Sequence, residues 1–169
     1  GHEEPGMGMI AELEPIWKQL NETYESLRHA LAHVPEERLN WQPGPTTNSV
    51  SVIVQHIVRA NLRYASFLGG PDPGLQHRRR EDLATPEHAG ERRERARLDD
   101  SERSLKATLE RVTPDALRAI HAGEWYPLDS HAVGPLDGFW FVLQMVRHSA
   151  YHLGQINLYL LLIEGETAA

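Results

Sequence analysis

The fold is decided by residues 139–163, which read FWFVLQMVRHSAYHLGQINLYLLLI. This is the most apolar part of the chain, and its length predicts one long helix that is buried on nearly every side. A helix that crosses a lipid bilayer would carry a large cost for its polar side chains, so we expect a buried helix of a soluble protein and no membrane partner. The polar side chains are Gln144, Arg147, His148, His152, Gln155 and Asn157.

The polar side chains of this helix follow one stripe. At roughly 100° per residue, Gln144, His148, His152, Gln155 and Tyr159 fall within about 80° of one another. A buried polar group without a partner costs on the order of 1–3 kcal/mol, so a row of such groups indicates a shared role. His148 and His152 have the i, i+4 spacing that lets one helix turn present two imidazoles to one metal ion. The alternative is a metal-free hydrogen-bond network.

A metal site of this kind needs a third ligand, and His56 is the candidate. It lies on a mostly apolar face of the expected second helix, so we expect it to point inward. Three neutral imidazoles leave the charge of the ion uncompensated and one position open, as in catalytic zinc sites. The donors suit several divalent transition metals. The side chains expected to orient the histidines are Gln144, Gln155, Tyr159 and Asn48 or Ser49.

The remaining histidines are expected to face solvent. His29 and His33 share the i, i+4 spacing, but they point away from the apolar stripe of the first helix. Four more lie in loop-like sequence: His77, His88, His121 and His131. No general base is identified; a loop carboxylate such as Glu124 or Asp129 could serve, and otherwise the reacting group is a water or thiolate on the metal.

The rest of the chain predicts three further helices. The first has apolar residues at intervals of three and four from Ile10 to Val34, and Pro15 is tolerated in its first turn only. The second is expected over residues 49–68, with Thr47 or Asn48 as its N-cap.

A polar passage over residues 69–90 leads to the third helix, which we expect to begin near Thr85-Pro86 and to end at Thr113-Pro114. Residues 119–134 are expected to be loop or short extended structure, and the last helix to begin near Pro135. The prediction is an all-α, antiparallel four-helix bundle with one long crossover connection.

The composition of the chain narrows the range of possible functions. The chain has 169 residues, no cysteine and a formal net charge of −7. Disulfides, Cys-ligated metals and a Cys nucleophile are excluded, a cytoplasmic location is expected, and nucleic acid is an unsuitable partner. Residues 1–8 are expected to be a tag remnant and frayed terminus, and residues 9–165 a single domain.

Two stretches resemble one known family. Residues 39–50, LNWQPGPTTNSV, followed by Val54-Gln55-His56-Ile57, are similar to the start of the second helix in the DinB-like (YfiT-like) family. Residues 146–156, VRHSAYHLGQI, resemble the last-helix signature of that family, H-x3-H followed by G-Q-I. The likeness covers the layout of essentially the whole chain and is specific in these two motifs.

The resemblance implies a four-helix bundle, often dimeric, that holds a divalent metal through His56, His148 and His152. The family includes S-transferases that use mycothiol or bacillithiol, a mycothiol-dependent isomerase, and proteins regarded as metal-dependent hydrolases. We therefore expect one divalent transition metal per chain, Zn or Ni first, with Fe, Co, Cu or Mn as alternatives. A low-molecular-weight thiol cosubstrate, a small-molecule electrophile and a homodimer are also expected.

Three functions stay open. The first is a metalloenzyme, with thiol transfer favoured over hydrolysis because no carboxylate base accompanies the ligands. The second is a non-catalytic metal-binding stress-response protein, in which a loop side chain such as His121, Glu124 or His131 closes the open position. The third is a metal-free structural bundle.

Overall fold

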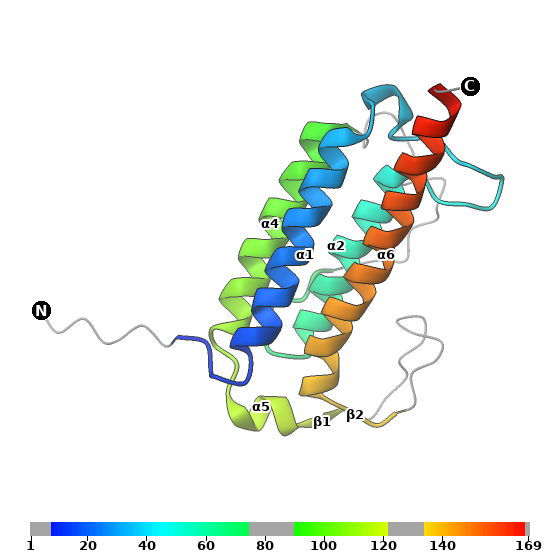
Figure 1. The fold of residues 1–169 in the computed structure, drawn as a ribbon. Helices are drawn as coiled ribbons and strands as arrows, with labels where there is room; N and C mark the ends of the chain where they lie inside the picture. Colours follow the sequence, from blue (N-terminus) through cyan, green and yellow to red (C-terminus); the bar gives the residue numbers. More distant parts are fainter. Residues whose placement is uncertain (1–7, 75–89, 122–133, 168–169) are drawn as a thin grey trace, which may run out of the picture.

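The structure, a computed structural model, describes residues 8–74, 90–121 and 134–167. Four long helices make up most of it: α1 (Glu14–His33), α2 (Val50–Ser66), α4 (Glu91–Leu109) and α6 (Gly138–Thr167). The shorter elements are the 3-10 helix η1 (Glu36–Arg38), the helix α5 (Pro114–Arg118), and the strands β1 (Ile120–His121) and β2 (Leu136–Asp137). The predicted all-α four-helix bundle is confirmed (Figure 1).

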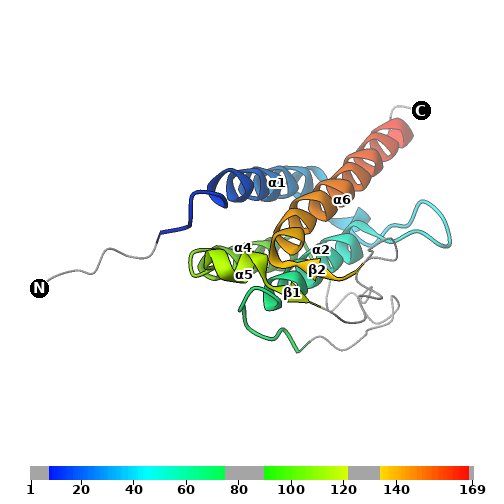
Figure 2. The same ribbon diagram turned by 90° about the horizontal axis from the view of Figure 1, so that it is seen from below.

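The long helices form two layers, with α1 and α6 in one and α2 and α4 in the other (Figure 2). The two helices of a layer run in the same direction, and the two layers run in opposite directions (Figure 1). Arg28 of α1 binds Asp99 of α4, whereas Asn21, earlier in α1, binds Glu102, later in α4, as antiparallel neighbours must. The parallel pair α2 and α4 is joined through residues 67–90, of which 75–89 lie outside the described residues.

The starts of the first two helices follow local chemistry. Pro15 lies in the first turn of α1, where its missing N–H is not needed, as predicted. The N-cap of α2 is Ser49, whose hydroxyl accepts a hydrogen bond from the N–H of Val52 at 3.2 Å. The prediction of Thr47 or Asn48 as this cap was wrong, because the Thr47 hydroxyl instead donates to the carbonyl of Gly44 at 2.9 Å in the preceding turn.

Helix α5 was not expected from the sequence. Thr113-Pro114 was expected only to end the third helix, but the Thr113 hydroxyl also caps a new one by accepting from the N–H of Ala116 at 3.2 Å. Residues 85–89, where the third helix was expected to begin, lie outside the described residues, and α4 is observed from Glu91.

The last helix begins later than predicted, at Gly138 instead of near Pro135. Residues 136–137 pair with β1, and the Asp137 carboxylate accepts from the N–H of Trp140 at 2.8 Å, so it caps α6. A Cβ atom at Gly138 would lie 2.3 Å from the carbonyl oxygen of Ala116, so α5 can pack here only against a glycine.

A hydrogen-bonded tetrad lies in the core, with one side chain from each long helix. Tyr24 Oη lies 3.0 Å from Ser101 Oγ, and the Asn61 amide donates to Tyr24 Oη at 3.1 Å and to Ser149 Oγ at 2.9 Å. All four side chains are buried. Because a buried polar group must keep its partners, the tetrad fixes the register of the four helices. Within the described residues, none of the helices combines the length and the apolar character that crossing a membrane requires.

Candidate metal centre

Three histidines meet at the seam between α2 and α6. The Nε2 atom of His148 lies 3.0 Å from Nε2 of His56 and 3.1 Å from Nε2 of His152. The potential ligand atoms of the three residues lie within 4.8 Å of one another, and no other group of this kind occurs among the residues that the structure describes. The structure thus brings together the three side chains that the sequence predicted as ligands.

The two helices place these side chains by their spacing and register. His148 and His152 are one turn apart on α6, and their ring centroids are 4.4 Å apart. The ring of His56 stands edge-on to both, at 4.8 and 4.7 Å. The bond from Asn61 to Ser149 joins α2 to α6 next to His148, so the tetrad holds the two halves of the cluster in register.

Gln155 orients one of the imidazoles. Its side-chain oxygen lies 2.6 Å from Nδ1 of His152, and because an amide oxygen only accepts, Nδ1 carries the proton. The Nε2 atom of His152 is then unprotonated in the neutral ring and presents its lone pair to the cluster. A second hydrogen bond of this kind is what a metal-binding histidine ordinarily has.

The cluster is more open than predicted. His148 and His152 are half-buried, but His56 is exposed, so the prediction that His56 points into the bundle was wrong. The inward face of α2 is taken by Ile53, Ile57 and Asn61, which are all buried and leave His56 at the edge of the seam. The cluster is therefore accessible to solvent on the His56 side.

The electrostatics favour the neutral form of two of the three rings. Although part of His56 is exposed, its ring packs edge-on against the rings of His148 and His152. The resulting desolvation, followed by repulsion from His152 and Arg59, lowers the pKa of His56 from 6.5 to about 4. Burial also lowers the pKa of His152, while the bond to Gln155 acts in the opposite direction. Near neutral pH both rings are uncharged, the form in which imidazole binds metals.

The donor set fits a divalent transition metal. With zinc–nitrogen bonds of about 2.0–2.1 Å, two nitrogens of a tetrahedral site lie about 3.3 Å apart. The two separations from His148, 3.0 and 3.1 Å, are close to that value, and all three potential ligand atoms lie within 4.8 Å of one another. Three imidazole nitrogens with no carboxylate suit metals such as zinc or nickel better than magnesium or calcium.

The other predicted partners form bonds elsewhere. The Tyr159 hydroxyl donates to the backbone carbonyl of Asn48 at 2.6 Å, which ties the start of α2 to α6. The side-chain oxygen of Gln144 accepts from the Arg147 guanidinium at 3.1 Å. Ser49 is the cap of α2. These bonds support the two helices, whereas the bond from Gln155 reaches a histidine directly.

Sequence reasoning missed three neighbours of the cluster. The Tyr64 ring stands edge-on to His148 at 6.0 Å, and the exposed Tyr151 ring stands edge-on to His152 at 5.1 Å. Arg59 acts electrostatically on His56. Arg59 lies at i+3 from His56, so the helical spacing alone could have identified it.

The remaining histidines are only partly as predicted. His29 and His33 are exposed, as expected. His121 was expected to be solvated, but it is half-buried in β1, with its ring 5.6 Å from Phe67 and 5.5 Å from Phe141. The pairing of β1 with β2 brings it there. Five further candidates lie outside the described residues: His77, His88, Glu124, Asp129 and His131.

The comparisons with known proteins agree with this architecture. The sequence profile of the DinB superfamily matches residues 19–156. The chain belongs to the DinB superfamily. A solved structure of the same fold is that of a "conserved protein of locus" from Enterococcus faecalis. It shares 17% identity at a TM-score of 0.69, over 90% of this chain and 97% of that one, and this likeness concerns the fold alone. No curated protein matches this chain.

Proposed function

We propose that this DinB-superfamily protein is a metal-dependent enzyme that holds one divalent transition metal through His56, His148 and His152. The observation that carries the proposal is the convergence of three Nε2 atoms at a seam that is open to solvent beside His56. Zinc or nickel is the proposed ion, with iron, cobalt, copper or manganese as alternatives. An open side leaves room for a substrate at the ion, as catalytic sites require.

A divalent ion at this place would lower the pKa of a thiol or water molecule bound to it. The chain prepares for that chemistry in two ways. Gln155 fixes the tautomer and the ring orientation of His152, and Tyr64 packs against His148. The positive charge of Arg59 reaches His56 and would favour an anionic group on the solvent side of the cluster.

Thiol transfer to an electrophile is the reaction that we favour. A thiol is deprotonated when it binds such an ion, so its attack needs no separate base. Attack by water is helped by a general base, and the cluster contains no carboxylate among the described residues. A low-molecular-weight thiol is therefore the proposed cosubstrate and a small electrophile the substrate. Hydrolysis is the alternative activity.

The test is turnover by the protein loaded with Zn²⁺ or Ni²⁺. Thiol–electrophile pairs are assayed beside activated esters and amides, with chelator-treated protein and His152→Ala as controls. Faster thiol consumption by the loaded wild type alone supports thiol transfer, and ester or amide cleavage alone supports hydrolysis. Metal binding without either activity would support a non-catalytic metal-binding protein instead.

We also propose that two copies associate through the outer face of α6. Large apolar side chains are exposed along it: Leu143, Tyr151, Leu158, Leu161 and Leu162. Among them Gly154 has nothing within 4 Å of the place of a Cβ atom, which leaves room for a second α6 helix to approach. Light scattering should show a dimer in the wild type and a monomer in Leu158→Lys; a wild-type monomer would contradict this.

A further inference from the structure

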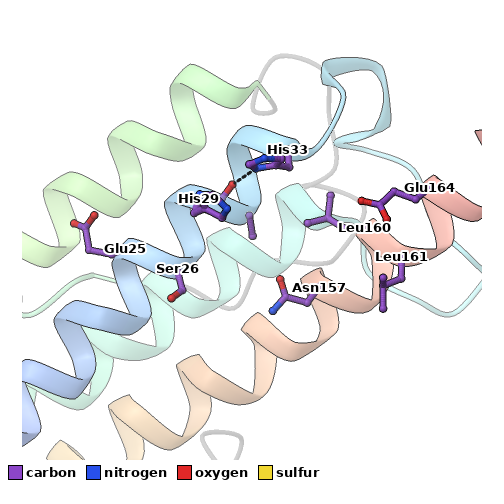
Figure 3. Close-up of a pocket in the computed structure, with 9 residues that line it drawn as sticks. Glu25, Ser26, His29, His33, Asn157, Leu160, Leu161 and Glu164 are labelled. Atoms are coloured by element: carbon purple, nitrogen blue, oxygen red, sulfur yellow. Dashed lines mark hydrogen bonds between the residues drawn. The ribbon is translucent and has the colours of Figure 1, made fainter.

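A second histidine pair lies in a groove on another seam of the bundle. The groove runs between α1 and α6, has a volume of about 800 Å³ and contains both His29 and His33 (Figure 3). The metal centre proposed above lies between α2 and α6, so the two sites share one helix but no side chain.

The two imidazoles have the arrangement of a chelating pair. Their ring centroids are 4.5 Å apart, against 4.4 Å for His148 and His152, which have the same spacing on α6. The Nδ1 atom of His33 lies 2.8 Å from the backbone carbonyl of His29, and a carbonyl only accepts, so Nδ1 carries the proton. In the neutral ring, Nε2 of His33 therefore keeps its lone pair, as in a metal-binding histidine.

The opposite wall of the groove supplies an acidic side chain. Glu164 and Asn157 of α6 line the groove across from the two histidines of α1 (Figure 3). Glu164 is exposed, and coordination would require its side chain to turn toward the imidazoles. Two imidazoles and one carboxylate form a donor set that divalent transition metals accept.

We propose that His29 and His33, together with Glu164, form a second and weaker site for a divalent transition metal. It is weaker because its three donors are not yet assembled. Among the described residues, only the first centre has three potential ligand atoms within 4.8 Å of one another. Rotation and ordering of an exposed side chain must precede full coordination in the groove. Binding here would join α1 to α6 within one layer of the bundle.

Titration of metal-free protein with Zn²⁺, purified without a nickel column, tests the proposal. The wild type should bind two equivalents, and His152→Ala should keep only the weaker one. His29→Gln with His33→Gln should keep only the tighter one, and Glu164→Gln should weaken the second equivalent by about tenfold, or 1.4 kcal/mol. Circular dichroism should show unchanged folding in the His29/His33 and Glu164 variants, because these three positions are exposed.

Two results would overturn the proposal. In the first, the wild type and the His29/His33 double variant bind the same number of Zn²⁺ equivalents, so the weaker equivalent does not depend on these histidines. The other is unchanged weak binding in Glu164→Gln, which would remove α6 from the site. Both results are independent of the first centre, which His152→Ala reports separately.

Discussion

The side-chain oxygen of Gln155 lies 2.6 Å from Nδ1 of His152, one turn earlier on α6. This contact fixes which nitrogen of His152 faces His148. We expect Gln155→Ala to weaken Zn²⁺ binding at the first centre by about 10–100-fold, because the ring loses its orientation and its tautomer. Gln155→Glu, which keeps an acceptor, should bind at least as well as the wild type.

Competition with a coloured chelator measures both affinities. An unchanged affinity in Gln155→Ala would show that the bond to His152 has no part in metal binding.

The lowered pKa of His56 predicts how the stability of the metal-free protein depends on pH. The pKa of the His56 ring is 6.5 in the unfolded chain and about 4 in the folded protein, so the unfolded chain binds more protons at pH values between these two. The stability that this group contributes is present above pH 6.5 and is lost as the pH falls toward 4. Urea midpoints in the presence of chelator should fall over this range, less steeply in His56→Gln. An equal slope in both would contradict the shifted pKa.

The buried tetrad predicts a stability cost in the metal-free protein. Asn61→Ala removes the donor to Tyr24 and Ser149 and leaves a cavity, so we expect a loss of about 1–3 kcal/mol or more in free energy of unfolding. Tyr24→Phe, which removes only a hydroxyl, should cost about 0.5–1.5 kcal/mol. Urea unfolding is measured in the presence of chelator, so that any effect of the tetrad on metal binding does not contribute. A wild-type midpoint in Asn61→Ala would show that the tetrad does not stabilise the bundle.

The buried carboxyl group of Glu94 should give the opposite dependence of stability on pH. Its side chain is fully buried in α4, and burial raises its pKa above 4.5, against hydrogen bonds from Ser51 and the charge of Arg97. The folded protein therefore holds this proton to higher pH than the unfolded chain, and the contribution is lost as pH rises through the raised value.

We expect Glu94→Gln, which stays neutral and can still accept from Ser51, to lose less stability between pH 5 and pH 8 than the wild type. Glu94→Ala should cost about 1–3 kcal/mol because the Ser51 hydroxyl loses its acceptor. Urea midpoints at the two pH values measure both effects. Parallel pH profiles for Glu94→Gln and the wild type would contradict a raised pKa.

The features that sequence predicted well depend on helical periodicity. The apolar spacing of the first helix and the polar stripe of the last one follow from about 3.6 residues per turn, and they place His148 beside His152 without any tertiary information. The same spacing pointed to Gln155, which contacts His152, one turn away on the same helix.

The features that the sequence did not predict depend on contacts between distant segments. The exposure of His56 is set by how α2 rotates around its buried residues Ile53 and Ile57. The place of His121 depends on the pairing of β1 with β2, two short strands with no periodic signal. Likewise, nothing local in the sequence shows that Asn61 contacts both Tyr24 and Ser149.

Metal content tests the central claim most directly. Tag-free wild type and His152→Ala, never exposed to a nickel column, are dialysed against a weak chelator and analysed for transition metals. We expect about one tightly bound metal ion per chain in the wild type and none in a folded His152→Ala variant. No retained metal and no uptake on titration of the wild type, or equal retention in both proteins, would contradict a metal centre at His56, His148 and His152.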